Sequence, residues 1–349
     1  MERLKQIVPA DRSAYRSAEE RWDSIAKPLG SFGLLEEAVK KIASVQGTAD
    51  ISISKCTAVV MCGDHGVTAE GITQCGSEVT AECARAIAEG RSNINAVASP
   101  FGIDVVAVDA GIRSDVDCSR LINRKVAYGT KNMAVEPAMT PEQTRQAIEV
   151  GINMVRDLKK NGTDLIIAGE MGIGNTTSAS AIASVMLGLP SEKVTGRGAG
   201  LSSEGLERKK ATVRRAIEVN KPDRNSPLDV LSKLGGFEIA GMTGLFLGGA
   251  VYHVPVVADG IISCASAVIA CKTVPVCSEY ILASHSSGEP CGDLLLELCG
   301  LVPIIRAGLK LGEGTGGVLL VPLIEGALSL YRNSHRFEET SIERYVRLK

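Results

Sequence analysis

Five short apolar runs divide the middle of the chain, and each is separated from the next by a helical pattern. Strands that alternate with helices along a sequence predict a parallel sheet with helices on both of its faces. We therefore expect an α/β fold with a Rossmann-like parallel sheet, and a sixth strand near Val274 or Val318. The five runs are residues 57–61, 105–108, 165–168, 254–258 and 280–283.

Some of the helices between these runs have clear starts and stops. The stretch TPEQ at 140–143 is a capping box with proline at the first helical position, and Asn161-Gly162 supplies the stop. That helix leads directly into the run at 165–168. We also expect helices over residues 203–220 and over the glycine-rich stretch 235–249, whose composition predicts tight packing.

Both ends of the chain are predicted to form a smaller part of the molecule. Residues 18–27 and 34–45 read as helices, separated by a break at Pro28, Gly30 and Gly33. They have no strand of their own to cover, and the charged stretch after Tyr331 is expected to pack against them. We predict a small helical domain from residues 1–45 with 325–349, and a large α/β catalytic domain from residues 46–324.

Each apolar run is followed by small residues together with an acid or a histidine. In an open parallel sheet these strand ends lie along one edge, and ligands bind in the crevice outside them. The five loops therefore predict a single site, although glycine and aspartate after a strand also serve simply to cap helices. The loops are residues 63–66, 109–111, 169–172, 259–260 and 284–289.

The third of these loops continues as GEMGIGNTT, residues 169–177, and then as an Ala/Ser-rich helical pattern. A helix N-terminus has unpaired N–H groups and partial positive charge, and glycines let a backbone approach an anion closely. We therefore predict a strand, a glycine loop and a helix start that together hold a phosphate. Glu170 would repel a phosphate, so we expect it to face another part of the ligand.

A second candidate carboxylate is Glu313, which stands between glycines in LKLGEGTGG, residues 309–317. With apolar Leu311 and Val318 nearby, a partly desolvated glutamate there would suit a general base. An ordinary solvated glutamate in a surface turn is the alternative. Asp64-His65 likewise fits either an acid/base pair or a histidine held by a hydrogen bond at a strand end.

Composition and motifs argue against several classes of protein. The 38 Lys and Arg are balanced by 40 Asp and Glu, and only 3% of residues are aromatic, which argues against nucleic-acid binding. None of the four histidines stands in a zinc-type motif, so no metal is expected. The first strand leads into GDHGV and not G-x-G-x-x-G, and the glycine loop lacks the Lys-Ser/Thr of a P-loop. A dinucleotide fold and nucleotide triphosphate hydrolysis are therefore disfavoured.

The ten cysteines are scattered and show no C-x-x-C spacing, and the chain starts without a basic-then-apolar leader. This pattern indicates reduced thiols in a cytoplasmic protein. No apolar run reaches the roughly 18 to 20 residues that a membrane span needs.

Six motifs, in order along nearly the whole chain, together resemble the nicotinate-nucleotide:dimethylbenzimidazole phosphoribosyltransferase family, which prepares the lower ligand of cobalamin. They are KPLGS at 27–31, GDHGV at 63–67, GEMGIGNTT at 169–177, GRG at 196–198, ADG at 258–260 and GEGTG at 312–316. The resemblance implies an inverting transfer of phosphoribose from nicotinate mononucleotide to an aromatic base. The products would be an α-linked riboside 5'-phosphate and free nicotinate, formed without a cofactor. A dimer, of identical chains or with a paralogue, is also implied.

The same resemblance implies roles for individual residues. Glu313 would be the general base that removes a proton from the attacking nitrogen, and Glu170 would lie near the base and the ribose. Met171 and Leu311 would flank the base. The residues implied to hold the phosphate, the ribose and the rest of the nucleotide are Gly172, Gly174, Asn175, Thr176, Thr177, Gly198, Lys209, Asp259, Gly260 and Ser287.

One region departs from the family pattern. After Gly71 the family has a Ser-Pro or Tyr-Pro pair and then a glutamine, both near the base pocket, whereas this chain has Cys75-Gly76 and Cys83. Thiols are weak hydrogen-bonding groups, so the two cysteines predict a pocket that accepts a phenol or a purine, besides or instead of dimethylbenzimidazole. Neutral drift in an ordinary enzyme is the alternative. A partner-dependent subunit and a protein that binds nucleotide without releasing nicotinate also stay open.

Overall fold

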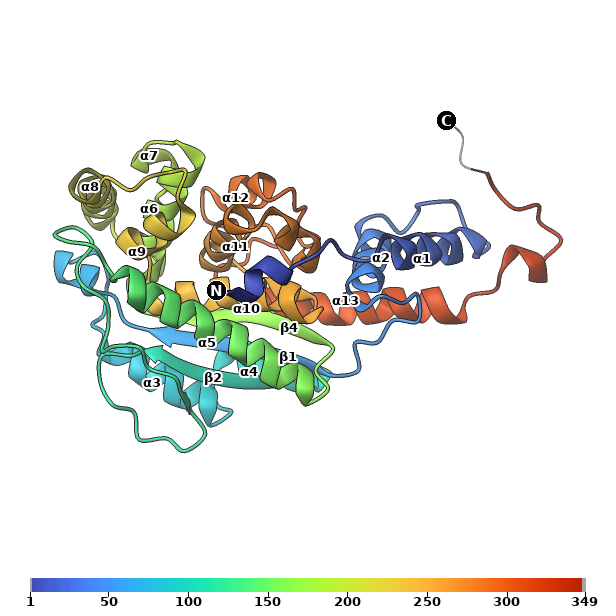
Figure 1. The fold of residues 1–349 in the computed structure, drawn as a ribbon, viewed down its shortest axis with the longest axis horizontal. Helices are drawn as coiled ribbons and strands as arrows, with labels where there is room; N and C mark the ends of the chain where they lie inside the picture. The colour runs from blue at the N-terminus through green and yellow to red at the C-terminus, as the bar shows by residue number, and fades with distance from the viewer. Residues whose placement is uncertain (1, 347–349) are drawn as a thin grey trace.

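The centre of the molecule is a six-stranded parallel sheet with the order β3-β2-β1-β4-β5-β6 (Figure 1). The computed structural model describes residues 2–346. The predicted α/β fold and all five predicted strands are present. The strands are β1 (Cys56–Gly63), β2 (Asp104–Gly111), β3 (Ile122–Asn123), β4 (Leu165–Met171), β5 (Val256–Ala258) and β6 (Ile281–Ala283).

The sixth strand lies elsewhere than predicted. It is the two-residue β3, which pairs with the end of β2 at the sheet edge. Val274 instead ends helix α11 (Ile261–Thr273), and Val318 lies inside helix α13 (Thr315–Asn333). A short apolar run cannot by itself distinguish a buried strand from a buried helix segment. At Val318 the run continues into a long helix whose buried residues include Leu320, Val321 and Ile324.

Helices cover both faces of the sheet, and the side chains of β1 alternate between the two resulting cores. Val59 and Met61 belong to the core formed with helices such as α5, α6, α10 and α11. Ala58 and Val60 belong to the core on the opposite face, with α2, α3, α4 and α13. Every residue of β1 is buried, as expected for a central parallel strand. The bounds of these helices are α2 (Leu34–Gln46), α3 (Glu78–Ala88), α4 (Asn93–Ala98), α5 (Pro141–Lys160), α6 (Asn175–Leu187) and α10 (Phe237–Tyr252).

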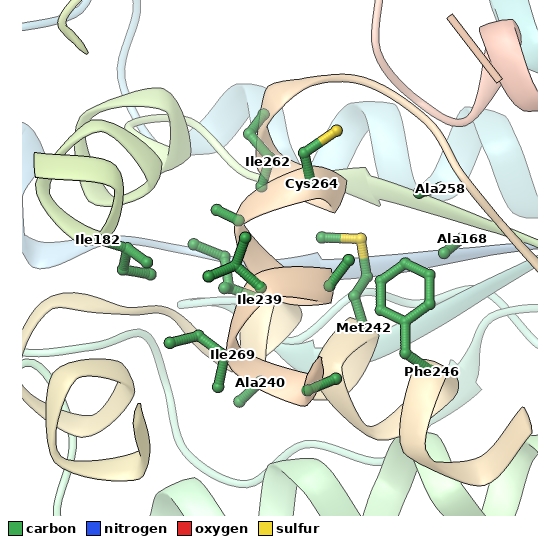
Figure 2. Close-up of a cluster of buried hydrophobic side chains, with 14 of the residues drawn as sticks. Ala168, Ile182, Ile239, Ala240, Met242, Phe246, Ala258, Ile262, Cys264 and Ile269 are labelled. Atoms are coloured by element: carbon green, nitrogen blue, oxygen red, sulfur yellow. The ribbon is translucent and has the colours of Figure 1, made fainter. Parts of the chain in front are cut away.

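Helix α10 lies at the heart of the first core. Figure 2 shows Met242 and Phe246 of α10 beside Ala168 of β4, with Ile262 and Ile269 of α11 close by. The predicted tight packing of the glycine-rich stretch is confirmed at Gly244, where an added Cβ would lie 2.0 Å from the backbone oxygen of Ile148 in α5. Only glycine permits this approach of the two helix backbones.

Other predicted helices are confirmed close to their expected bounds. The Thr140 side chain accepts from the N–H of Gln143 at 3.1 Å, Pro141 is the first residue of α5, and Asn161 ends that helix. Helix α8 spans Ser203–Asn220, as the sequence predicted. The remaining helical segments are η1 (Glu2–Gln6), η2 (Gly66–Glu70), η3 (Ser99–Phe101), α7 (Ser191–Val194), α9 (Pro227–Leu234), η4 (Pro275–Tyr280), α12 (Gly292–Leu298) and η5 (Phe337–Glu339).

Beside the sheet, α1 (Arg12–Ser24), α2 and the last turns of α13 form a helical projection (Figure 1). The rings of Trp22 and Tyr331 lie 5.1 Å apart, and Arg336 donates to the Ser24 hydroxyl at 2.7 Å. The predicted packing of the C-terminal stretch on the N-terminal helices is thus confirmed. Residues before α1 contact the large part instead, since Tyr280 donates to the Val8 carbonyl at 2.9 Å. The division into two domains stays a prediction.

Within residues 2–346, no helix is both long enough and apolar enough to cross a membrane.

Candidate active site

A cavity of about 250 Å³ opens at the carboxyl ends of the strands, where the sequence predicted a site. It collects residues from the loops after β4, β5 and β6 and from the loop before α13. A second cavity, of about 380 Å³, lies between α1, α2 and β6, away from the glycine loops. The first cavity is lined by Glu170, Met171, Gly172, Ile173, Asn175, Thr176, Gly198, Ala199, Gly260, Ile261, Ile262, His285, Ser287, Glu289, Leu309, Lys310, Leu311, Gly312 and Glu313.

Two helix N-termini without a side-chain cap face this cavity. The N-cap of α6 is Gly174, with φ of 98°, and the N-cap of α11 is Gly260; neither has a side chain to pair with the first N–H groups. A third N-terminus, that of α13, is already occupied by Asp259, which accepts from Gly314 at 3.2 Å and from Gly317 at 3.1 Å. The uncapped N-termini of α6 and α11 therefore offer partial positive charge to an anion.

Glu170 lies at the end of β4 on the cavity wall and is 8% exposed. Burial, followed by the charges of the nearby carboxylates of Asp259 and Glu238, raises the pKa of its carboxyl to about 8. Asn175 donates a hydrogen bond to this carboxyl, which opposes the shift. A carboxyl with this pKa exchanges a proton near neutral pH, and the added positive charge of a ligand would favour its ionised form.

Glu313 lines the cavity in a left-handed backbone conformation, with φ of 61°. Its Oε1 accepts from the side-chain amide of Asn93 at 3.0 Å, and its Oε2 accepts from the N–H of Ile94 at 3.0 Å. Both donors belong to the first turn of α4, so the carboxylate caps that helix from a distant part of the chain. A non-glycine residue in this region is uncommon and persists only where its surroundings hold it.

Lys209 stands behind the glycine loop and reaches it through Thr176. Its Nζ donates to the Thr176 hydroxyl at 2.8 Å, and the residue is 1% exposed. Burial lowers the pKa of this amine to about 8, although the charge of Glu289 partly opposes the shift. Glu289 also accepts from the N–H of Gly198 at 3.2 Å. When the amine is charged it donates to Thr176, so the hydroxyl hydrogen is left to point toward a ligand.

Most of the residues implied by the resemblance meet in this one cavity. Glu170, Glu313, Met171, Leu311, Gly172, Asn175, Thr176, Gly198, Gly260 and Ser287 all line it. Gly174, Lys209 and Asp259 support the wall from behind, by the contacts described above. Thr177 is fully buried in the first turn of α6, and its hydroxyl has no hydrogen-bond partner within residues 2–346.

Neither of the two unusual cysteines lines the cavity. Cys75 is exposed in the loop before α3, and Cys83 is half-buried within α3. Burial raises the pKa of the Cys83 thiol, and the charge of Glu313 raises it as well. Cys83 is therefore within electrostatic reach of the predicted general base.

Asp64 and His65 do not pair with each other as an acid and a base. Asp64 accepts from the N–H of Arg113 at 2.8 Å, whereas the imidazole of His65 contacts Glu238 at 2.5 Å and Ser178 at 2.9 Å. His65 and its two partners are all buried. Of the two alternatives that the sequence left open, the geometry favours the histidine held by hydrogen bonds.

Several residues of the site were missed by the sequence reasoning. Asn93 and Ile94 donate hydrogen bonds to Glu313, although they lie 220 and 219 positions before it in the sequence. No local motif reveals contacts at such a separation. His285 and Glu289 line the cavity from a loop that the sequence had placed at the site without assigning them roles. The serine at 92, which precedes α4 in a capping box, is the local signal for the helix start that receives Glu313. Within residues 2–346, no group of three or more His, Cys, Asp or Glu is arranged to hold a metal ion.

Comparisons with known proteins show which proteins this chain is similar to. Residues 7–342 match a family model described as phosphoribosyltransferase. The nicotinate-nucleotide–dimethylbenzimidazole phosphoribosyltransferase of Acetivibrio thermocellus is 43% identical over 342 residues, 98% of this chain and 97% of that protein. The enzyme of the same name from Clostridium tetani is 43% identical over 341 residues, 98% of this chain and 94% of that protein. The crystal structure of CobT from Thermus thermophilus superposes with a TM-score of 0.89 at 36% identity, covering 95% of this chain and all of that one.

Proposed function

The chain belongs to the nicotinate-nucleotide–dimethylbenzimidazole phosphoribosyltransferase family, and from this premise we propose that its cavity moves phosphoribose from nicotinate mononucleotide to an aromatic base. The family is one of pentosyltransferases. The observation that carries the proposal is the placement of two carboxylates, Glu170 and Glu313, on the wall of a cavity that also receives the uncapped N-terminus of α6.

The phosphate of nicotinate mononucleotide would bind at the N-terminus of α6. The glycines of this loop have no Cβ to keep a ligand at a distance, and the first N–H groups of the helix carry partial positive charge. Thr176 lies in the same turn, and Lys209 donates to its hydroxyl at 2.8 Å. The hydroxyl would then donate its own hydrogen to a phosphate oxygen.

Glu170 would face the reacting end of the nucleotide. In nicotinate mononucleotide the ring nitrogen is a pyridinium, and the ribose C1 gains positive charge as the bond to nicotinate breaks. The pKa of the Glu170 carboxyl is about 8 in the ligand-free site. A neighbouring cation would favour the ionised form, so the carboxylate would gain strength as a stabilising charge during the reaction.

Glu313 would be the general base. The incoming base attacks C1 with a ring nitrogen, its N–H proton passes to Glu313, and nicotinate leaves with the electron pair of the broken C1–N bond. The new bond forms on the opposite face of the ribose and gives the α-riboside 5'-phosphate. Each oxygen of Glu313 already accepts one hydrogen bond from the first turn of α4. These two hydrogen bonds fix the orientation of the carboxylate toward the incoming aromatic base.

The second part of the proposal concerns the aromatic base, for which we infer a broader specificity. Met171 and Leu311 line the cavity near Glu313, and Cys83 lies close enough for the charge of Glu313 to raise the pKa of its thiol. Neither thiol at 75 or 83 offers a strong hydrogen bond to a ring nitrogen. We therefore infer that a phenol, whose hydroxyl Glu313 would deprotonate, or a purine is accepted beside dimethylbenzimidazole.

A single experiment tests the reaction. Purified chain is incubated alone with nicotinate mononucleotide and, in separate reactions, with dimethylbenzimidazole, phenol, p-cresol or adenine, and free nicotinate is measured. We expect base-dependent release of nicotinate. No release with any base would contradict the proposal for the chain alone and favour a partner-dependent subunit, for which a mixture with a paralogue is the next test.

The same panel decides the specificity. Turnover of phenol or adenine at rates comparable to dimethylbenzimidazole would support the broader pocket, and exclusive turnover of dimethylbenzimidazole would remove that part of the proposal. The matched variant is the double substitution Cys75→Ser with Cys83→Gln, which we expect to shift preference toward dimethylbenzimidazole. The resemblance also supports a dimer, of identical chains or with a paralogue, which light scattering on the purified chain distinguishes.

A further inference from the structure

His65 uses both of its ring nitrogens to join three separate parts of the chain. Its Nε2 lies 2.5 Å from Oε1 of Glu238, and its Nδ1 lies 2.9 Å from Oγ of Ser178. His65 follows β1, Glu238 is in the first turn of α10, and Ser178 is in the first turns of α6. The three residues, which we call the His65 network, are no more than 1% exposed.

The network lies directly beneath the glycine loop. A Cβ added at Gly174 would come within 3.2 Å of the His65 Cβ, and one added at Gly172 would come within 3.3 Å of Oε1 of Glu238. A Cβ added at Gly236, just before α10, would lie 2.3 Å from Cε1 of His65. The glycine loop therefore packs against the Cβ of His65 and the carboxylate of Glu238, and the backbone before α10 packs against the imidazole, with no room for a side chain at these glycines.

None of the three residues lines the cavity. Ser178, however, follows Asn175 and Thr176 within the same helix start, and both of those residues do line it. A hydrogen bond at Ser178 thus fixes the direction in which α6 presents its first N–H groups. Glu238 anchors the other side of the imidazole to α10, which packs across the centre of the core.

The network also reaches Glu170 through electrostatics. Glu238 is one of two carboxylates whose charge raises the pKa of Glu170, and Asp259 of the loop after β5 is the other. Burial raises the pKa of the Cys62 thiol in β1, and the charges of Asp109 and Glu170 raise it as well. From the helix start, Asn175 donates a hydrogen bond to the Glu170 carboxyl. The Nε2 of His65 and the Oε1 of Glu238 lie 2.5 Å apart and are joined by a hydrogen bond.

We propose that His65, held between Glu238 and Ser178, is the positioning residue that sets the glycine loop and the N-terminus of α6 in the geometry that binds the phosphate of nicotinate mononucleotide. The proposal rests on the function proposed above, because it names which part of that substrate the network serves. It predicts that substitutions in the network weaken recognition of the substrate phosphate and leave recognition of the base unchanged.

The test compares nicotinate mononucleotide with nicotinate riboside, which lacks the phosphate. The quantity measured is the ratio of the two kcat/KM values, since a loss of folded enzyme lowers both values equally and leaves the ratio unchanged. For His65→Gln, which keeps a donor toward Glu238 but loses the contact with Ser178, we expect the ratio to fall by about tenfold or more. Ser178→Ala, a smaller change that removes one hydroxyl, should lower the ratio in the same direction. The KM for the base should stay within about twofold.

Inhibition by ribose 5-phosphate provides a second readout that does not need turnover of the riboside. Its inhibition constant should rise in both variants, whereas that of nicotinate should not. His253→Asn is the matched control: His253 lies at the opposite end of α10, its φ of 53° suits asparagine, and its Nδ1 contacts Tyr280 at 3.4 Å. We expect this control to leave both readouts unchanged.

The outcomes separate the two proposals. A ratio and an inhibition constant that stay within about twofold of wild type in His65→Gln and Ser178→Ala would overturn the positioning role while leaving the reaction intact. Failure of the wild-type chain to release nicotinate would instead contradict the proposed function itself. A fall in the ratio that also appears in His253→Asn would mean that a histidine substitution at the opposite end of α10 has the same effect, which would overturn the specific role of His65.

Discussion

The carboxylate of Glu313 accepts a hydrogen bond from the backbone N–H of Ile94 at 3.0 Å, although the two residues are 219 positions apart. Asn93 donates to the other oxygen at 3.0 Å. The first turn of α4 thus holds a carboxylate that belongs to the loop before α13. This arrangement explains how a glutamate keeps a left-handed backbone, with φ of 61°, between two glycines. The position of the proposed general base is set by tertiary contacts and not by its own loop.

Replacement of Glu313 by alanine or glutamine should remove most turnover while leaving the binding of nicotinate mononucleotide nearly unchanged. General-base assistance of this kind contributes about 10²- to 10⁴-fold to rate, so we expect a loss in that range. The glutamine side chain keeps one oxygen that can accept a hydrogen bond, so it is the better-matched variant. Release of nicotinate measures turnover, and calorimetric titration measures binding. Release at the wild-type rate by either variant would rule out Glu313 as the base.

Asp259 should matter first for the stability and placement of α13. It accepts from the N–H groups of Gly314 and Gly317, so Asp259→Ala leaves both donors without their cap. Loss of a helix cap costs about 0.5 to 2 kcal/mol, and we expect a fall of that size in the free energy of unfolding. Because Gly314 follows Glu313, turnover should fall too. Asp259→Asn keeps one acceptor oxygen and should lose less stability, so equal losses in the two variants would contradict the capping role.

Glu170 should make the stability of the protein depend on pH in a direction opposite to that of most paired acids. Its pKa is raised from 4.5 to about 8, mainly by burial. Between these values the folded protein holds a proton that the unfolded chain has released, so the contribution of Glu170 to stability is fully present below pH 4.5 and is lost as pH rises toward 8. Each unit of pKa shift corresponds to about 1.4 kcal/mol.

The matched variant isolates this effect from all other titrating groups. In Glu170→Gln the proton-dependent contribution is absent, so the melting temperature of wild type should fall relative to that of the variant between about pH 5 and pH 8. Thermal unfolding followed at several pH values measures the difference. A gap between the two proteins that stays constant across this range would show that Glu170 keeps an ordinary pKa.

How much of this site can be seen in the sequence depends on how local each signal is. The apolar runs predicted five strands, and the glycine loop at Gly172 and Gly174 predicted a helix start, because both patterns are short and continuous. The two-residue β3 has no such pattern. The run at Val318 was misplaced as a strand because a buried helix segment looks the same over a few residues. The pairing of His65 with Glu238 spans 173 positions and arises only when α10 packs on the sheet.

Lys209 should make the binding of nicotinate mononucleotide weaker as pH rises above about 8. Burial lowers the pKa of its amine from 10.5 to about 8, so the folded protein loses this proton before the unfolded chain does. The neutral amine would accept from the Thr176 hydroxyl, and the hydroxyl would then no longer donate to the phosphate. A bound phosphate favours the charged form of the Lys209 amine. Above pH 8 the protein should therefore take up a proton when it binds nicotinate mononucleotide.

Calorimetric titration at pH 8.5 in two buffers of different ionisation enthalpy measures that proton directly. Wild type should take up a fraction of a proton on binding nicotinate mononucleotide, and Lys209→Met should take up none from this group and bind several-fold more weakly at pH 7. Lys210→Met is the matched control, because the neighbouring Lys210 pairs with Glu207 at 2.8 Å on the outer face of α8. Proton uptake that persists unchanged in Lys209→Met would assign the titration to another group. The same affinity for all three proteins at pH 7 would place the phosphate away from Thr176, at the N-terminus of α11.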